Sequence, residues 1–558
     1  MPANRKRHDA YGVYILNDVD GATPQALHRV TTLSVTTDQS VDGIMELTNE
    51  GMVEWKADVP VSTISLGGNQ IAKMIEDATD EDTGVSPLHW LGLLAGQDAL
   101  GTDRVKIFVI GDPKYAGTAG STSETSMFDT VTTSGGNAVD VTADMLIPVR
   151  GASGLEATVY IAQLAVTSLS LSFSVDGYAE WSADLEADNY HRFQNGSSDW
   201  RGVTATAHTV VAPEDDNNEV SLPGASDVML VYLNGEELIE VSDESELGSA
   251  SQGYRRWYFT GTSIKFSDGL IAEGDFLRIV YLPTTPKAWS DYALATGPGD
   301  QGAIRRGELD IYLITDTTAP RIIEGFVPSL SEATISVSAG STWIASSANG
   351  DLELIYATDT TGVTLDASGL SDGTHTVYLS YNGSNLSLTT SNSGNNTVAV
   401  ASVIVSDGAI TSFSDARDFK RNSLSLVQTA SFSIDLSREV IYQLGDQRAV
   451  SRSLNRPVTI SADVTALDYG DEIVTLLSGG TVGSTNSIDF DSMSNRLGIQ
   501  VNLYSSTDRT DDNKTVVFEA TDMRPTSVGN TISTGASGEV SFTLNGDTFV
   551  ALECASVS

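Results

Sequence analysis

Short runs in which apolar and polar residues alternate dominate the chain. They include TASFSID (429–435), RPVTISADV (456–464), VMLVYLNGEELIEV (228–241) and LGIQVNLYS (497–505), and Gly, Asn, Asp and Ser separate them. Alternation with a period of two places successive side chains on opposite faces of a strand. Asn234 and Gly235 lie between two such runs and are typical of a two-residue hairpin turn, where both positions favour positive φ. The pattern predicts a mainly β fold.

Helical periodicity is confined to two short segments. In GGNQIAKMIED (67–77), Ile71, Met74 and Ile75 are spaced to line one side of a helix. A shorter segment, YGDEIVTLL, begins at Tyr469. The sequence therefore predicts one short helix in each half of an otherwise β-rich chain.

The segment from residue 30 to residue 61 recurs 397 positions later without a gap. Ten of its 32 positions are identical, where composition gives roughly two in a random register. The first copy has Val30, Thr32, Ser34, Asp38, Ser40, Ile44, Leu47, Val53, Pro60 and Val61, and the second has Val427, Thr429, Ser431, Asp435, Ser437, Ile441, Leu444, Val450, Pro457 and Val458. An offset of 359 likewise aligns Glu180, Ser182, Leu185 and Asp188 with Glu539, Ser541, Leu544 and Asp547. Between these segments each copy has a helix and then a strand, expected to be RVKIFVIG (104–111) in copy one and LGIQVNLYS in copy two.

The repeat predicts two homologous β-sandwich domains with inserted β modules between them. Copy one is expected in residues 1–204 and copy two in residues 417–558, with modules in residues 205–300 and 301–416. The acidic stretch 211–227 is expected to be a linker. RRGELDIYLITD (305–316) either returns to the sheet of copy one or opens the second module.

Each copy places roughly 20 residues between its first two strands, more than a usual hairpin loop. This connection carries large aliphatic side chains, whose exposure to water is unfavourable. It either folds onto its own domain or forms an arm that buries those side chains against a neighbouring subunit, where each is worth about 1.5–3 kcal/mol. The residues expected in contact with a neighbouring subunit are Ile44, Leu47, Val53, Pro60, Ile441, Leu444, Val450 and Pro457.

The chain is strongly acidic. It has 31 Lys and Arg against 74 Asp and Glu, a formal net charge of -43, with 40% hydrophobic residues. A folded protein of this kind stays dispersed in concentrated salt, so a halophilic source is expected, with an ordinary acidic protein as the alternative. The charge argues against a protein that grips nucleic acid, because such a protein neutralises phosphates with clustered cations.

Residue patterns for catalysis, cofactors and metals are missing from the sequence. The six histidines have no zinc spacing, Cys554 is the sole cysteine, and no phosphate-binding glycine motif occurs. Asp508, Asp512 and Glu519 match calcium-loop positions one, five and twelve, but the turn glycine is missing, so a solvated loop is expected. We expect no enzyme, no cofactor and no metal, although a triad built from distant residues leaves no local signature.

No stretch approaches the ~20 apolar residues of a membrane span, and the N-terminus lacks an apolar run of signal-peptide length. We therefore expect no membrane association and no secretion.

Copy two carries a characteristic order of motifs: DLSREVIYQLG (435–445), a long loop, RPVTISADV, and a helix. This order resembles the major tail tube protein of long-tailed, siphovirus-like viruses. Copy one keeps the frame but has Asp42-Gly43 in place of Glu439-Val440, and Thr48 in place of Gly445, so it is the diverged copy. The resemblance covers somewhat more than half of the chain.

The resemblance implies tail-tube-type β-sandwich domains whose hairpin sheets join in a shared inner barrel, in stacked rings of six domains. With two domains per chain, homotrimeric rings would have pseudo-sixfold symmetry. It further implies a virion component assembled in the host cytoplasm, with other tail proteins at the tube ends and double-stranded DNA passing through without specific binding. Carboxylates facing the lumen would repel phosphates. With the acidic composition, the host is expected to be a halophilic archaeon.

Three other classes of protein fit a β-rich modular chain. A receptor-binding or fibre-type tail protein would form trimers or monomers without stacked rings. An archaeal cell-surface structural protein is the second alternative, and a hydrolase is the third.

Overall fold

A computed structural model describes the protein from residue 11 to residue 554. The residues outside its description are 1–10, 17–23, 28, 40, 46–51, 58–59, 70, 72–106, 111–130, 133–137, 140–142, 152–153, 188–189, 196–197, 235, 293–303, 358–359, 361, 425, 443–448, 455–457, 468–471, 478–495, 511–512, 532–537 and 555–558. The described chain is mainly β, as predicted. Its α-helices are short, α2 (Ala212–Asn217) and α3 (Glu472–Leu477). Helix α3 confirms the helix expected in YGDEIVTLL, whereas most of GGNQIAKMIED lies outside the described residues.

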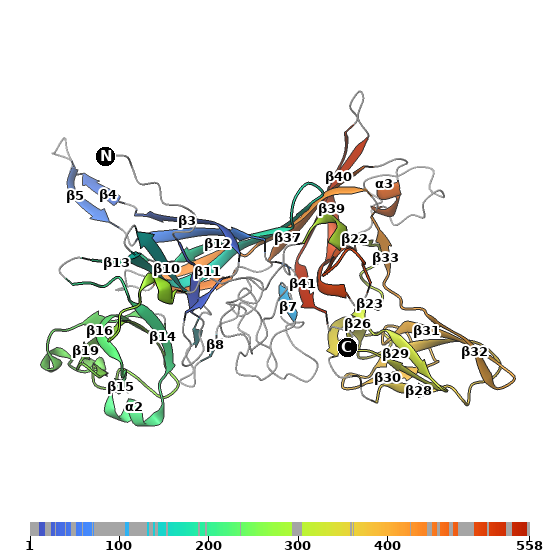
Figure 1. The fold of residues 1–558 in the computed structure, drawn as a ribbon, viewed down its shortest axis with the longest axis horizontal. Coiled ribbons are helices and arrows are strands. Elements are labelled where there is room, and N and C mark those ends of the chain that lie inside the picture. Colours follow the sequence, from blue (N-terminus) through green and yellow to red (C-terminus); the bar gives the residue numbers. More distant parts are fainter. Residues whose placement is uncertain are drawn as a thin grey trace.

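One antiparallel sheet runs through the middle of the molecule, and we call it the shared sheet (Figure 1). Its order is β3-β6-β12-β11-β34-β37-β40-β39, with the C-terminal halves of the long strands β11 and β39 taking part. The strands are β3 (Val30–Asp38), β6 (Val61–Gly68), β12 (Glu180–Ala187), β11 (Gly154–Ser174), β34 (Val427–Asp435), β37 (Thr459–Leu467), β40 (Glu539–Gly546) and β39 (Lys514–Thr531).

The N-terminal halves of β11 and β39 enter two further sheets, which we call the outer sheets. The first has the order β2-β1-β10-β11-β13 and the second the order β33-β22-β38-β39-β41. Their other strands are β1 (Tyr14–Leu16), β2 (Gln25–Ala26), β10 (Ala143–Gly151), β13 (Tyr190–Gln194), β22 (Leu309–Ile314), β33 (Arg421–Ser423), β38 (Leu497–Tyr504) and β41 (Thr548–Glu553). We call β1–β3, β6 and β10–β13 unit one, and β22, β33, β34 and β37–β41 unit two.

The two units share their strand register as well as their strand order. In unit one Ile161 lies opposite Met145 and Tyr190, and in unit two Ala520 lies opposite Ile499 and Phe549. The offset of 359 therefore holds along the whole length of β11 and β39, beyond the four residues from which it was read.

The backbone irregularities recur at the same places. Gln163 in β11 and Asp522 in β39 have φ of 57° and 54°, and Arg29 and Leu426, just before β3 and β34, have φ of 44° and 60°. Positive φ in a non-glycine residue is uncommon, so its recurrence at corresponding positions marks a repeated bend. At Gln163 and Asp522 the long strand leaves its outer sheet and enters the shared sheet.

Three strand assignments differ from the sequence expectation. Strand β10, and not RVKIFVIG, occupies in unit one the place that LGIQVNLYS (β38) has in unit two. β7 (Ile107–Ile110), from RVKIFVIG, instead pairs with β41 of unit two. Segment 305–316 forms β22 within unit two, although the expected boundaries put it in the second module. An apolar run shows that a strand exists, but its partner depends on distant residues that periodicity does not report.

The pairing of β6 with β3 and of β37 with β34 corrects the sequence alignment of the repeat by one residue. Asp38 lies opposite Val61, whereas Asp435 lies opposite Thr459, so the sequence match of Val61 with Val458 is one residue out of structural register. Unit two has one more residue in the connection, and sequence similarity at Pro60 and Pro457 concealed it.

Each unit is layered, and the side chains of its outer sheet divide between two cores. Ile15, Met145 and Ile161 face the shared sheet in a core that spans both units. Tyr14, Leu146 and Tyr160 alternate with them and face the first module. In unit two, Val517, Val550 and Leu552 similarly face the second module. The modules therefore lie on the far side of the outer sheets from the shared sheet.

The first module is a two-sheet sandwich around Trp257, Leu277 and Ile279. Its strands are β14 (Thr204–Thr209), β21 (Phe276–Pro283), β16 (Ala225–Leu233) and β17 (Glu236–Glu237) in one sheet, and β15 (Glu219–Ser221), β20 (Ser263–Phe266), β19 (Arg256–Phe259) and β18 (Ile239–Glu240) in the other. The turn at Asn234 is confirmed, with φ of 49° between β16 and β17. The linker expected at 211–227 is wrong, because α2 and β15 form there inside the module.

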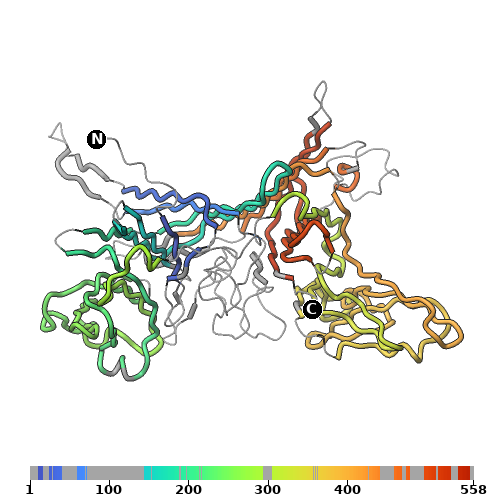
Figure 2. Tube along the Cα trace, viewed as in Figure 1, coloured from blue at the N-terminus to red at the C-terminus, as the bar shows by residue number. Residues whose placement is uncertain are grey.

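The second module has a core that includes Val377, Leu379 and Val403. Its strands are β23 (Arg321–Gly325), β26 (Gly340–Ala345) and β27 (Leu352–Ala357); β24 (Pro328–Ser331), β25 (Thr334–Val337) and β28 (Thr364–Asp366); and β30 (Leu386–Thr389), β29 (Gly373–Tyr381), β31 (Thr397–Ser406) and β32 (Ala409–Asp415). The two modules lie at opposite ends of the molecule, on the same side of the shared sheet (Figures 1 and 2).

The connection that was expected to be a long loop is a β-hairpin in both units. β4 (Val41–Met45) pairs with β5 (Met52–Ala57), and β35 (Arg438–Tyr442) pairs with β36 (Ala449–Leu454). We call these two hairpins the arms. β8 (Val131–Thr132) and β9 (Ala138–Val139) form a separate two-stranded sheet, apart from the shared sheet and the outer sheets.

Candidate assembly interface

Strands β11 and β34 join unit one to unit two edge to edge. Their ladder runs from Ser168 opposite Asp435 to Ser174 opposite Thr429. The backbone N–H of Leu436 donates to the Thr167 carbonyl at 2.9 Å and extends the ladder by one bond. Within the shared sheet, β11 is the edge strand of unit one and pairs with β34, the opposite edge strand of unit two, so the junction is head to tail.

The buried face of this junction is apolar and aromatic. Leu169 lies opposite Ile434, and Leu171 lies opposite Phe432. The rings of Phe173 and Phe432 meet edge to face with centroids 6.3 Å apart. Each of these side chains is at most 2% exposed, and such aromatic pairs add about 0.5–1.5 kcal/mol to the effect of burial alone. The junction is therefore as well packed as the interior of a domain.

The opposite face of the shared sheet is covered by hydroxyl and carboxyl groups. Its described ladder positions hold a single arginine, Arg524 at one end of β39, and no lysine. The exposed or half-buried residues of this polar face are Ser34, Thr36, Asp38, Thr63, Ser65, Ser168, Ser170, Ser172, Glu180, Ser182, Asp184, Glu186, Thr429, Ser431, Ser433, Asp435, Thr459, Ser461, Asp463, Thr465, Ser527, Glu539, Ser541, Thr543 and Asn545.

Hydroxyls donate to carboxylates across the strands of the polar face. Ser65 Oγ donates to Asp184 Oδ1 at 2.6 Å, and Ser168 Oγ donates to Asp184 Oδ2 at 3.0 Å. At the corresponding place in unit two, Thr543 Oγ1 donates to Asp463 Oδ1 at 2.5 Å, so donor and acceptor have exchanged strands. The polar face is a fixed, negatively charged surface that offers a phosphate very few cations.

The shared sheet ends in two edges that have no described partner. Among the described residues, β3 pairs only with β6, and the C-terminal half of β39 pairs only with β40. Leu33, Val35 and Val528 on these edges are only half-buried, although they pack against the core. Phe432, which corresponds to Val35, is 1% exposed because β11 covers it. An open edge with half-covered apolar side chains is suited to pairing with another chain.

The structure leaves the predicted arm contacts untested. Pro60 is half-buried directly before β6. Ile44, Val53, Ile441 and Val450 lie on the arms, but their own side chains are not described, and Leu47, Leu444 and Pro457 lie outside the described residues. Their contact with a neighbouring subunit stays a prediction.

Each module is held to its outer sheet by a buried ion pair. In unit one Asp144 of β10 accepts hydrogen bonds from Arg278 of the first module and from the Tyr160 hydroxyl. Asp144 and Arg278 are 0% and 4% exposed. Burial, together with the charge of Asp144, raises the pKa of Tyr160 well above its usual value, so this phenol remains a donor.

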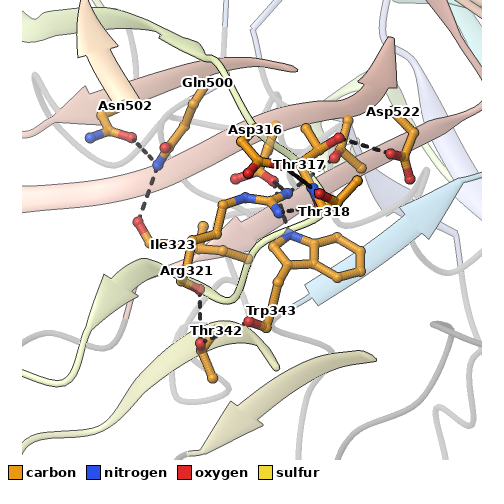
Figure 3. Close-up of polar contacts among 12 residues, drawn as sticks. Asp316, Thr317, Thr318, Arg321, Ile323, Thr342, Trp343, Gln500, Asn502 and Asp522 are labelled. Carbon is orange, nitrogen blue, oxygen red and sulfur yellow. Dashed lines mark hydrogen bonds and ion pairs between the residues drawn. The ribbon is translucent and has the colours of Figure 1, made fainter. Parts of the chain in front are cut away.

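In unit two the pair is Arg321 with Glu519. Figure 3 shows Arg321 beside the Trp343 indole in this cluster. Arg321 Nη2 donates to Glu519 Oε1 at 2.7 Å, and the Trp343 indole donates to the same oxygen at 2.9 Å. Arg321 comes from the second module and Glu519 from β39. Glu519 lies opposite Gln500 and Val550, as Tyr160 lies opposite Leu146 and His191, so Glu519 corresponds to the tyrosine that donates to Asp144. The two ion pairs thus lie near one another in the two units, but their carboxylates come from different strands, β10 and β39.

Sequence reasoning missed both anchors. Glu519 was considered as the last position of a solvated calcium loop, but it is 1% exposed and paired with Arg321. The N-terminal half of β39 and all of β38 are buried on both faces, so the alternation that identifies exposed positions is lost there. A charged residue inside an apolar run was the only available signal.

Other chemistry is sparse in the described part of the chain. No group of three or more His, Cys, Asp or Glu side chains there could hold a metal ion. His208 lies 2.8 Å from Glu214, and His375 lies 2.7 Å from the Ser371 carbonyl, both within the modules. No described helix is long and apolar enough to cross a membrane.

Comparisons with known proteins include a loose structural likeness to a solved structure. No family model matches the chain, and no curated protein matches it. Among solved structures, the chain is similar to one from a cryo-EM structure of the anti-feeding prophage baseplate, symmetrised six-fold. The identity is 10%, the TM-score is 0.20, and the match covers 35% of this chain and 98% of the other. A superposition this loose carries no part of the argument below.

Proposed function

We propose that this chain is a structural virion protein that assembles into stacked rings and forms the hollow tail tube of a long-tailed virus. The observation that carries the proposal is the head-to-tail junction of β11 with β34, which leaves the corresponding strands β39 and β3 open at the two ends of the sheet. A head-to-tail interface that repeats from chain to chain generates a ring when the rotation closes. Closing the sheet also removes its open edges.

The proposed ring size follows from the resemblance of the sequence to major tail tube proteins. Rings of six tube domains need three chains when each chain supplies two, which gives pseudo-sixfold symmetry. Other tail proteins would cap the ends of the tube, and assembly would take place in the cytoplasm of the host. The acidic composition favours a halophilic archaeal host.

The polar face is proposed to line the lumen. DNA carries one negative charge per about 1.7 Å of duplex, so a conduit lined with cations would hold it. The carboxylates of Asp184 and Asp463 repel phosphates, and the hydroxyls of Ser65 and Thr543 donate to these carboxylates, so the duplex would pass without specific binding. The modules lie on the side of the outer sheets away from this face and would decorate the outside of the tube.

Negative-stain microscopy of the purified protein in high salt tests the proposal. We expect hollow tubes of uniform width. Compact monomers or isolated trimers under the same conditions would instead favour the receptor-binding or fibre-type alternative.

A deletion separates the tube from its decoration. Ile314 and Arg421 are opposite one another in the β22–β33 ladder, so an Asn-Gly turn can replace residues 315–420 and remove the second module. Without the module, Val517 and Leu552 of the outer sheet would be exposed to water, so Val517→Thr and Leu552→Thr are added to make that surface more polar. We expect tubes with an unchanged lumen and a smaller outer diameter, and loss of tubes would count against an external role for the module.

A further inference from the structure

The open edges of the shared sheet repeat the strands of the internal junction. β3 stands in unit one where β34 stands in unit two, and β39 stands in unit two where β11 stands in unit one. The bulge in β11 between Val166 and Ser168 recurs in β39 between Pro525 and Ser527. The open edges β3 and β39 therefore correspond to β34 and β11, which pair with one another inside the chain.

We propose that β39 of one chain pairs with β3 of a second copy in the register of the internal junction. Ser168 lies opposite Asp435 and Ser170 opposite Ser433 within the chain. Between chains, the corresponding pairs are Ser527 with Asp38 and Gly529 with Thr36. This inference rests on the proposed function, since it specifies the contact by which the ring closes.

The side chains on the two edges support this register. It places Ser527, Gly529, Thr36 and Asp38 on the polar face, and Val528 with Thr37 on the core face. The core side chains Val35 and Val528, half-buried at present, would then be covered as Phe432 and Leu169 are covered inside the chain. A slip by one residue would turn these apolar groups toward the polar face.

The chemistry of the two junctions also differs, and this difference has a consequence for assembly. Inside the chain Leu169 faces Ile434, and Phe432 contacts the Phe173 ring. Between chains Val528 would face Thr37, and Val35 replaces Phe432. Because burial free energy scales with the apolar area removed from water, the contact between chains is the weaker one. Rings would therefore open between chains and leave each pair of units intact.

Paired cysteines test the register in the full-length chain. In a background with Cys554→Ala, the pair Thr36→Cys and Gly529→Cys should form disulfides between chains on mild oxidation of assembled protein, because directly opposed strand residues have suitable spacing. Gly529 tolerates a side chain, since a Cβ there would come no closer than 3.4 Å to its neighbours. On a denaturing gel, dimers and trimers should appear, with the trimer as the largest species.

Two matched pairs serve as controls. Ser170→Cys with Ser433→Cys, at the same position of the internal junction, should close within one chain and leave its mass unchanged. Thr37→Cys with Gly529→Cys is one residue out of register and should not close, since these side chains point to opposite faces.

The outcomes separate this inference from the proposed function. Tubes in the microscope without Thr36/Gly529 disulfides, or with Thr37/Gly529 disulfides in their place, overturn the register and spare the tube. If the internal control pair closes while the chain forms neither disulfides between copies nor tubes, both the inference and the proposed function fail. Covalent species that grow beyond trimers contradict a closed ring of three chains.

Discussion

The buried ion pairs that hold the modules are the most consequential single-residue features. Arg321 and Glu519 are each 1% exposed, and the Trp343 indole and the Thr521 hydroxyl complete the cluster. Charges taken out of water recover their desolvation cost only when they are paired. These residues therefore fix where the module sits more than they add to its stability.

Removing one partner of this pair should be costly. Arg321→Ala leaves the Glu519 carboxylate buried without its cation, and we expect a loss of about 3–5 kcal/mol in the free energy of unfolding. The double change Arg321→Met with Glu519→Leu should restore most of the loss. Lys420→Ala, which breaks the exposed ion pair with Asp418, should cost less than about 1 kcal/mol. Denaturant unfolding of the three variants gives the comparison, and equal losses would contradict the assignment.

The buried tyrosines at the first module predict sensitivity to alkali. Burial raises the pKa of Tyr292 to about 12, whereas an unfolded tyrosine titrates near about 10. Between these values the unfolded chain loses a proton that the folded chain keeps, so stability is complete below the lower value and falls as the pH rises through the window. The melting temperature of the wild-type protein should fall more steeply there than that of Tyr292→Phe. Parallel pH profiles would show that Tyr292 has no part in it.

At the scale of elements, the sequence predicted strands well and their partners poorly. The alternation of apolar and polar residues identified β34, β37 and β40. Their apolar side chains point into the core, and their polar side chains lie on the polar face. It also located the turn at Asn234. It did not show that β22 belongs to unit two, because pairing across some 190 residues leaves no trace in local periodicity. It likewise missed that β38 is buried on both sides, where Gln500 and Asn502 are enclosed.

The polar face gives a prediction about DNA. Ser172 and Ser431 are directly opposed on this face. Changing both to Arg adds cations around the proposed lumen, and we expect assembled tubes to retain duplex DNA at low salt and to release it steeply as salt rises. The variant with Gln at both positions adds a polar side chain without charge and should retain none. Co-sedimentation of tubes with DNA measures the difference, and equal retention by the wild type would contradict a repelling lumen.

At the scale of the whole molecule, the chain is two units that act as one structural piece. A common core runs beneath both units, and β7 of the N-terminal part pairs with the last strand of unit two. The two units are thus tied at more than one place. A ring built from such pieces has strong contacts within each chain and weaker ones between chains.

This hierarchy should be visible during disassembly. With increasing denaturant, or with salt lowered so that the net charge of -43 is no longer screened, rings should release single chains before those chains unfold. Sedimentation should therefore report loss of assembly at conditions where circular dichroism still reports native β structure. Coincident transitions would mean that the contacts between chains are as strong as those within them.

The central claim is that the shared sheets of several chains merge around a hollow axis with the polar face inward. Cryo-electron microscopy of the assembled protein, viewed along that axis, tests it most directly. The account predicts a continuous wall of strands, six units from three chains, with the β3 and β39 edges paired and Asp184 and Asp463 facing the lumen. A wall in which those edges stay unpaired, or in which the hydroxyl and carboxyl face points away from the axis, would contradict it.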